Sequence, residues 1–425
     1  MSIEAPLQIH SEIAPLEAVI VHTPGLEIER MTPARAEELL YNDIVPMSVV
    51  QREHRVLSGV LGSLCECYEL SDLLVRALEP ERARAELLDA VCSREPAAGR
   101  REELDAMPLL ELANVLVTGM PIRRDSLSSW LEPRGWDLPP LPNQYFMRDA
   151  GFVVDNCPVS GSMAHEIRYR ESLIMKTVFG WLQTSGAGPT SGTGQTSGTG
   201  PTSGTLSLDS ASFAGRIEGG DIVVLRDDLI AAGIGSRTSS EALDQLARAL
   251  AQHRGSPVTV IACLLPEERY AIHLDMIFTR IDEGSALVHA PAVVGHRASR
   301  CVRLDVDPTG RTSVREAGFL LDALAEAGVD LEPVFCGGPD YTHQVREQWL
   351  SGTNSFAVAP GKILVYDCNR YTLDELSRHG YEVIPAETYD HLRAGDRKVA
   401  IALPGVELAR GGGGPRCMTL PLRRA

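Results

Sequence analysis

The sequence predicts an α/β protein built from small repeated modules, with a block of helices inserted near its start. Strand-like apolar segments come in close pairs, such as 222–225 and 229–232, and helical segments fall between the pairs. The stretch from 72 to about 117 is helical in pattern and has no clear strand. Paired strands with one helix, recurring along the chain, suit a repeated module better than a single doubly wound sheet.

The first elements are a strand and two helices. Leu16–Val21 reads as a strand. A helix is expected from Pro33 to Leu40, because Thr32 suits the N-cap and proline suits the first helical position. A second helix is expected over 51–64. Within the helical block, apolar residues at helical spacing predict short helices near 73–78, 83–91 and 109–117.

Strand-like segments dominate the rest of the chain. They are 151–154, 222–225, 229–232, 258–262, 276–281, 286–290, 334–336, 355–359, 363–366, 383–385 and 399–403. Helices are expected between them at 240–251, 314–326 and 373–379. The segment 189–205 repeats a six-residue unit, PTSGTG, that lacks bulky apolar side chains. It therefore predicts a flexible surface loop over 184–207.

Composition and charge exclude several classes of protein. The chain has 425 residues, 44% hydrophobic and 23% charged, as in an ordinary globular protein. Its formal net charge of −17 argues against a nucleic-acid surface, which needs clustered Lys and Arg. No stretch of 18 apolar residues predicts a membrane span, and the N-terminus does not read as a secretion signal.

The cysteines favour a reducing compartment and no metal. Nine cysteines are scattered, without a CxxC pair or a Cys/His cluster of zinc type. We therefore expect a cytoplasmic protein that needs no metal and no cofactor.

Three segments carry unusual polar groups at predicted strand ends. They are Asn143–Asp149, Glu218–Asp221 and His273–Asp275. If the third is extended, His273 and Asp275 point to the same side of a sheet. Each segment alone is better explained as a solvated turn or as ordinary packing, but their combination with one cysteine is harder to dismiss.

That cysteine, Cys417, follows four consecutive glycines at 411–414, Pro415 and Arg416. Glycine allows a backbone to pass close to a ligand, and a neighbouring cation favours the nucleophilic thiolate. A buried structural cysteine beside a turn is the simpler interpretation, but it leaves the glycine run unexplained.

A thiol, an imidazole and several carboxylates suit chemistry on a guanidinium. Carboxylates match the planar fork of a guanidinium through parallel hydrogen bonds. A thiolate would attack the central carbon, and a histidine would protonate the departing ammonia and then activate water. This would be hydrolysis without a metal.

These motifs resemble the arginine deiminase family, within the guanidine-modifying (pentein) superfamily. The resemblance runs from about Leu16 to Arg424. Besides the segments above, it rests on Thr23–Leu26, Glu38–Asp43, Gly235–Thr238 and Arg346–Trp349. It implies a five-bladed α/β propeller of ββαβ modules with an inserted helical domain. The expected domains are 1–71 and 141–425 for the propeller and 72–140 for the insert.

The resemblance also implies roles for residues. Cys417 would be the nucleophile and His273 the general acid/base, with Glu218 in the proton-transfer network. Asp149 and Asp275 would hold the guanidinium nitrogens. The amino-acid end would be bound by Asn143, Arg168 and Arg237, and the aliphatic stem walled by Phe146 and Leu40. Without the resemblance, Arg168 is explained by an ion pair with Glu166 or Glu171, and Arg237 by a surface charge.

The chain departs from the family pattern at several positions. Many members have an arginine where Gly412 stands, so Arg410 or Arg416 is a candidate for the missing contact with the substrate carboxylate. Asn42 replaces a common Asp, the segment 386–405 is long, and the Thr-Ser-Gly repeat is peculiar to this chain.

The expected activity is hydrolysis of L-arginine to L-citrulline and ammonia through a covalent Cys417 intermediate. The alternatives are an amidinotransferase, a deiminase of another guanidine such as agmatine, and an inactive arginine-binding sensor. We expect a small-molecule substrate and neither a nucleic-acid nor a membrane partner. The sequence leaves both a monomer and a homo-oligomer open.

Overall fold

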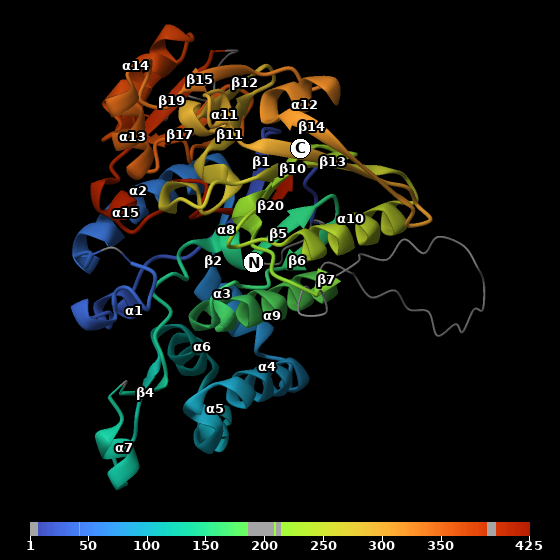
Figure 1. Cartoon of the computed structure of the whole chain (residues 1–425). Coiled ribbons are helices and arrows are strands. Elements are labelled where there is room, and N and C mark those ends of the chain that lie inside the picture. Colours follow the sequence, from blue (N-terminus) through green and yellow to red (C-terminus); the bar gives the residue numbers. More distant parts are fainter. Residues whose placement is uncertain (1–6, 42, 134, 186–207, 210–213, 389–396) are drawn as a thin grey trace.

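The computed structural model describes residues 7–41, 43–133, 135–185, 208–209, 214–388 and 397–425. The predicted loop at 184–207 lies almost entirely outside these residues, as does Asn42. The predicted α/β class is confirmed: helices alternate with strands, and the sheets mix parallel and antiparallel pairs (Figure 1).

Five sheets share one core topology, in which a strand pairs antiparallel with one neighbour and parallel with another. Each sheet has three core strands. The first sheet consists of β20 (Leu420–Arg424), β1 (Leu16–Val21) and β2 (Glu66–Glu69), and the second of β5 (Gly151–Val154), β6 (Cys157–Ser160) and β7 (Leu208–Asp209). The third has β8 (Ile222–Arg226), β9 (Leu229–Ile234) and β10 (Val258–Leu264), the fourth β11 (Phe278–Asp282), β12 (Ser285–Val288) and β15 (Glu332–Phe335), and the fifth β16 (Phe356–Ala359), β17 (Lys362–Tyr366) and β19 (Val399–Leu403).

A helix precedes the third strand in each sheet, as a parallel connection requires. These helices are α2 (Met47–Leu64), α9 (Tyr169–Ser185), α10 (Ser240–Arg254), α12 (Leu320–Glu326) and α14 (Arg370–Arg378). The third sheet is extended by β13 (Arg300–Val306) and β14 (Thr312–Phe319), and the last by β18 (Glu382–Pro385).

Between β2 and β5 the described residues are mainly helical, and they hang below the five sheets in Figure 1. They form α3 (Leu70–Ala77), α4 (Glu81–Arg94), α5 (Arg101–Asp105), α6 (Leu109–Thr118) and α7 (Leu127–Leu131), with a short pair β3 (Met120–Pro121) and β4 (Trp136–Leu138). The domain limits at 72 and 140 stay a prediction.

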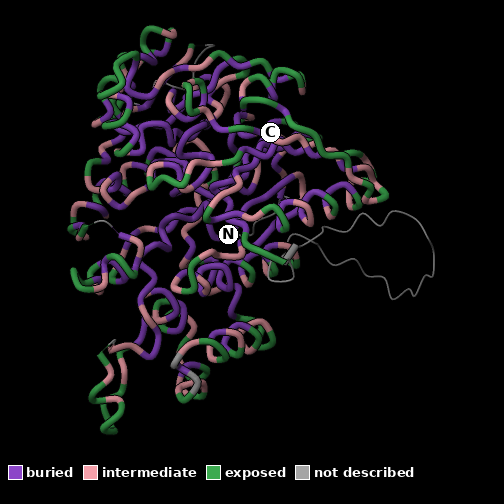
Figure 2. Tube along the Cα trace, viewed as in Figure 1, coloured by how far each residue is buried: buried purple, intermediate pink, exposed green. Residues whose placement is uncertain are grey.

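The five sheets and the helical segment between β2 and β5 differ in how deeply their residues are buried. Buried residues concentrate in the strands of the five sheets, whereas α7 is almost wholly exposed (Figure 2).

The remaining helices are α1 (Leu26–Glu29), α8 (Met147–Ala150), α11 (Ala290–Val293), α13 (Tyr341–Trp349) and α15 (Val406–Arg410). No helix among the described residues is long and apolar enough to cross a membrane. The cytoplasmic location stays a prediction.

Two predicted helices differ in the structure. Residues 314–319 belong to strand β14, and α12 begins only at Leu320, because pairing with β13 overrides the local helical pattern. The predicted helix 33–40 is a 3-10 turn over Pro33–Arg35 followed by further turns, and the Thr32 side chain makes no capping hydrogen bond. Leu40 ends these turns with a φ of 67°, a left-handed conformation that is uncommon for leucine.

Candidate active site

Cys417 lies in the buried loop between α15 and β20, fixed by backbone hydrogen bonds on both sides. Its side chain is nearly inaccessible, at 4% exposure. Its N–H donates to Oδ1 of Asn354 at 3.0 Å, and its carbonyl accepts from the N–H of Arg148 at 3.0 Å. Its Sγ lies 3.8 Å from Oδ2 of Asp275.

The glycine run is required by close packing around this loop. A Cβ on Gly414 would lie 2.6 Å from the carbonyl oxygen of Asn354, and one on Gly413 would overlap the Phe146 ring. Gly412 differs, because its φ of 99° favours glycine while the space around it is open. The glycines therefore let the loop pack against Phe146 and Asn354 beside the sulfur.

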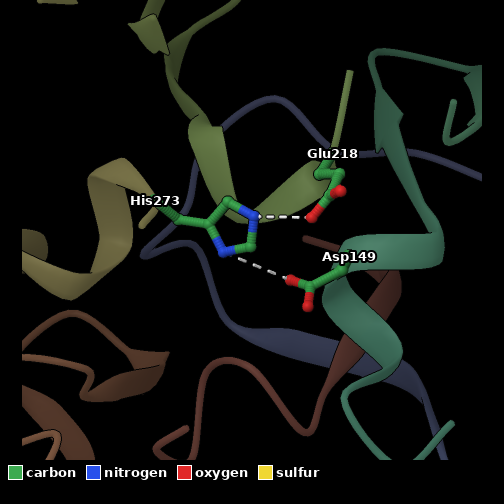
Figure 3. Close-up of side chains that lie close together, drawn as sticks. All are labelled: Asp149, Glu218 and His273. Atoms are coloured by element: carbon green, nitrogen blue, oxygen red, sulfur yellow. Dashed lines mark hydrogen bonds and ion pairs between the residues drawn. The ribbon is translucent and has the colours of Figure 1, made fainter. Parts of the chain in front are cut away.

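His273 lies between two carboxylates (Figure 3). Its Nε2 is 2.8 Å from Oε2 of Glu218, and its Nδ1 is 3.6 Å from Oδ1 of Asp149. Burial disfavours the charged imidazolium, but the charges of Asp149 and Glu218 outweigh burial and raise the pKa of His273 to about 9. His273 therefore carries a proton at neutral pH and is equipped to act as an acid.

The backbone after His273 is not the expected strand. Leu274–Met276 form a 3-10 turn, and the strand β11 begins only at Phe278. The turn is held by Oδ1 of Asp221, which accepts from the Leu274 N–H at 2.9 Å. It brings Asp275 to the sulfur while His273 faces Glu218, so the alternation expected of a strand is wrong here.

Gly220, two residues after Glu218, allows His273 to approach closely. A Cβ on Gly220 would lie 2.6 Å from Nδ1 of His273 and 3.1 Å from Oδ1 of Asp149. Side-chain carbons do not approach other atoms so closely, and the imidazole has no room to retreat because it is 1% exposed.

Gly220→Ala is therefore expected to displace the imidazole and to lower kcat/KM by about 100-fold, the usual cost of a misplacement near 1 Å. Steady-state kinetics on purified protein checks this. The matched control is Gly180→Ala on α9, where a Cβ meets no atom within 4 Å, and it should leave kcat/KM unchanged. Equal rates in the two variants would contradict the assigned packing.

Two aspartates each keep one carboxylate oxygen without a hydrogen bond from any described residue, although Oδ1 of Asp149 also faces Nδ1 of His273 at 3.6 Å. Asp149 accepts from Nη1 of Arg168 at 2.8 Å through Oδ2, and Asp275 accepts from Nη1 of Arg416 at 2.8 Å, also through Oδ2. Within the described part of the chain, the Oδ1 atoms of both aspartates are buried and have no hydrogen-bond partner. Buried carboxylate oxygens without donors are costly, so the arrangement suits a ligand that supplies N–H groups.

Of the residues predicted for the amino-acid end, Arg168 contacts Asp149, whereas Arg237 and Asn143 have other partners. Arg168 also binds Glu171, with contacts of 2.7 to 3.1 Å, as the ion-pair alternative proposed. Nη1 of Arg237 lies 3.4 Å from Glu218, and Nδ2 of Asn143 donates to the Leu39 carbonyl at 2.8 Å. Arg168, Arg237 and Asn143 are all buried. The ring of Phe146 lies against the glycine loop, and Leu40 is half-buried.

The two arginines considered for the missing carboxylate contact are committed elsewhere. Arg416 is 2% exposed and binds Glu12 and Asp275. Arg410 binds Glu407 at 2.6 Å and also pairs with Asp43.

The cation beside Cys417, Arg416, is not enough to make the thiol ionise readily in the free site. Burial, together with the charges of Asp275 and Asp149, raises the pKa of Cys417 well above its ordinary value, and Arg416 offsets only part of this rise.

Glu218 stays ionised although it is buried. Burial alone would raise its pKa, but Arg237, His273 and Arg168 lower it below the ordinary value. The free site thus holds a neutral thiol, a protonated imidazole and an anionic glutamate. A bound cation would favour the thiolate by balancing the negative charge of the aspartates.

The same groups have the composition of a metal site. Ligand atoms of Asp149, Glu218 and His273 lie within 4.8 Å of one another. However, Nη1 of Arg168 lies 2.8 Å from Asp149 and 3.9 Å from Glu218, and Arg237 is also close to Glu218. Two fixed guanidinium groups beside the carboxylates disfavour a divalent cation by charge repulsion.

Several residues of this site carry no motif in the sequence. Asn354 and Glu12 support Cys417 and Arg416 from distant parts of the chain, so sequence spacing gave no signal for them. Asp221 stands in the Glu218–Asp221 motif, but its support of the Leu274 turn depends on contacts that only the structure reveals.

Comparison with known families decides the relationship of this chain. A family model described as arginine deiminase matches residues 37–186 and 205–424, most of the chain. The chain belongs to the arginine deiminase family. Among its arginine deiminase relatives, the protein of Listeria monocytogenes serotype 4a (strain HCC23) is 30% identical over 446 residues, covering 100% of this chain and 99% of the relative. That of Bacillus cereus (strain B4264) is 29% identical over 443 residues, with 99% and 98% covered.

Solved structures resemble this arginine deiminase family member in fold. The amidinotransferase SxtG from Microseira wollei, of the saxitoxin biosynthetic pathway, has a TM-score of 0.54 at 13% identity and covers 99% of this chain and 98% of its own. The inosamine-phosphate amidinotransferase from Streptomyces griseus has a TM-score of 0.50 at 15% identity, with 100% and 98% covered. At these identities the similarity concerns the fold alone.

Proposed function

We propose that this protein hydrolyses L-arginine to L-citrulline and ammonia. The observation that carries this function is the pair of unsatisfied Oδ1 atoms on Asp149 and Asp275, buried beside a thiol and a protonated imidazole. A guanidinium is planar, cationic and rich in N–H donors, so it matches two carboxylate oxygens on opposite sides. Family membership supports the same substrate class.

The first half-reaction forms a covalent adduct. The bound guanidinium favours ionisation of Cys417, which loses its proton to solvent, and the thiolate attacks the central carbon, forming a C–S bond. Transfer of a proton from His273 to one nitrogen lets ammonia leave as the C–N bond breaks. The result is a thiouronium that still carries the rest of the amino acid, with Glu218 orienting the imidazole.

The second half-reaction releases citrulline. The now neutral His273 takes a proton from water, which attacks the same carbon and forms a C–O bond. The added hydroxyl gives its proton to solvent as the C=O bond forms, the C–S bond breaks, and Cys417 returns as the thiolate. One water is consumed, and one ammonia and one citrulline are produced, without a redox change or a cofactor.

We assign the amino-acid end of the substrate to Asn143, Arg168 and Arg237, and its aliphatic stem to Phe146 and Leu40. The positions support this, since Arg168 contacts Asp149, Arg237 lies 3.4 Å from Glu218, and Phe146 lies against the cysteine loop. The strained φ of Leu40 also fits a functional position.

We propose further that the five sheets are the blades of a five-bladed α/β propeller with an inserted helical domain. Its support is the shared ββαβ order of the five sheets. The first blade would close the ring, because its strand β20 comes from the C-terminus while β1 and β2 come from the N-terminal part.

Product analysis tests the activity. Purified protein incubated with L-arginine should release citrulline and ammonia in equal amounts. A chelator should not change the rate, because the two arginines beside the carboxylates disfavour binding of a divalent cation. Ornithine that appears only when an amine acceptor is added would identify an amidinotransferase, and faster turnover of agmatine would identify another guanidine as substrate. Calorimetry showing arginine binding without any product would indicate a sensor.

A further inference from the structure

Arg416, next to the nucleophile, is held on every side by the protein. Its Nε and Nη2 donate to Oε2 and Oε1 of Glu12 at 3.3 and 2.9 Å, a two-point contact. Nη2 also donates to the Ile222 carbonyl at 2.7 Å, and Nη1 donates to Oδ2 of Asp275 at 2.8 Å. The side chain is 2% exposed, so its guanidinium is a fixed part of the site.

Glu12 anchors this guanidinium from the opposite end of the chain. Its N–H donates to the carbonyl of Val224 at 2.8 Å, which ties the segment to β8. Burial alone would raise the pKa of Glu12, but Arg416, Arg148 and Arg424 together lower it to about 2. Glu12 is therefore a permanent anion among three buried cations, and the position of Arg416 depends on it.

The consequence falls on Asp275. Its Oδ2 accepts from Arg416 and is also the oxygen 3.8 Å from the sulfur of Cys417. Arg416 thus occupies Oδ2, and Oδ1 is left as the oxygen without a hydrogen-bond partner among the described residues. The cation also reduces the negative charge that the thiolate must face when it forms.

We propose that Arg416, fixed by Glu12, is a positioning residue that divides the two oxygens of Asp275 between the protein and the substrate. The inference rests on the proposed function, since it takes Asp275 as the ligand of a guanidinium. It adds that the N-terminal segment, through Glu12, is required for chemistry at the C-terminal cysteine. A competing view is that Arg416 occupies a substrate position and blocks it.

The test compares two alkylating agents that react with Cys417. Chloroacetamidine carries a planar cationic amidinium that forms charge-assisted hydrogen bonds with the Oδ1 atoms, whereas iodoacetamide offers them only a neutral amide. In the wild type, chloroacetamidine should react at least about 10-fold faster than iodoacetamide at pH 7.5. Arg416→Met and Glu12→Gln should lose most of this selectivity, and kcat/KM for arginine should fall about 100-fold, the cost of a misplaced catalytic group.

Controls separate positioning from general damage. Arg423→Met and Glu17→Gln break a peripheral ion pair on the neighbouring strand β20 and should change neither selectivity nor turnover. If Arg416→Met does not fold, Glu12→Gln preserves size and shape and carries the test. Melting temperatures identify variants that are merely unstable.

A double-mutant cycle gives the decisive outcome. If Arg416 acts through Asp275, adding Arg416→Met to Asp275→Asn should cost nothing further. Additive losses, or unchanged selectivity in a folded Arg416→Met, would overturn the proposal, and a gain in kcat/KM would establish the blocking view instead. The alkylation selectivity is measured without arginine, so it remains decisive even if arginine proves not to be the substrate.

Discussion

Cys417→Ala is expected to abolish citrulline formation, with a fall in kcat of at least about 10⁴-fold, the scale reached when a catalytic nucleophile is removed. The reason is chemical: no other group in the site can form the covalent bond to the guanidinium carbon. Arginine binding should persist, because the Oδ1 atoms of Asp149 and Asp275 that receive the guanidinium are unchanged. Citrulline assays and calorimetry on the same preparation measure both quantities.

The matched control is Cys263→Ala on β10. Cys263 is as deeply buried as Cys417 but belongs to a separate hydrophobic cluster with Cys301. This variant should lose some stability and keep the wild-type kcat. Ammonia release that persists in Cys417→Ala would contradict nucleophilic catalysis by this residue.

His273→Ala is the second large prediction, with an expected fall in kcat of about 10² to 10⁴-fold, the usual contribution of a positioned acid or base. The imidazole is the group that protonates ammonia and later activates water, and its link to Glu218 at 2.8 Å fixes its orientation. His253→Ala on α10 is the control, because that imidazole is also hydrogen-bonded, to Asn156, yet has no place in the site. A near-normal kcat in His273→Ala would contradict the assigned role.

The pH profile of kcat/KM tests the same residue in the wild type. The pKa of His273 is raised to about 9, so the imidazole keeps its proton below that value and loses it above. The reaction needs the thiolate together with the protonated imidazole, and the pKa of the Cys417 thiol lies above that of His273 in the free site. We therefore expect kcat/KM to rise with pH and to level off near pH 9, where His273 loses its proton. A rise that levels off near pH 6.5, the ordinary value for histidine, would mean that Asp149 and Glu218 do not act on His273 as the structure places them.

The sequence motifs located the reacting groups because their chemistry needs rare side chains in recognisable settings. The cysteine behind the glycine run lies against the His-Leu-Asp segment, whose histidine contacts the Glu-Gly-Gly-Asp segment and Asp149. What the motifs could not give is the set of partners. Asn354 and Glu12 contact residues 63 and 404 positions away, and such contacts arise only from the arrangement of the sheets.

The fold was predictable at the level of class and least so where tertiary pairing decides. Strands with a strong apolar run, such as Leu16–Val21, have the predicted bounds. The helix predicted at 314–326 instead begins as strand β14, because β13 supplies its hydrogen bonds. The turn after His273 depends in the same way on a carboxylate from Asp221, 53 residues earlier, which no local pattern reveals.

Trapping the covalent intermediate tests the central claim most directly. The protein is mixed with arginine labelled in both the guanidino carbon and the amino-acid chain, rapidly quenched in acid during turnover, digested and analysed by mass spectrometry. The proposed mechanism predicts that the peptide containing Cys417 carries both labels, at the mass of arginine less ammonia. A peptide without label, or one carrying the guanidino carbon without the amino-acid chain, would contradict hydrolysis through this cysteine.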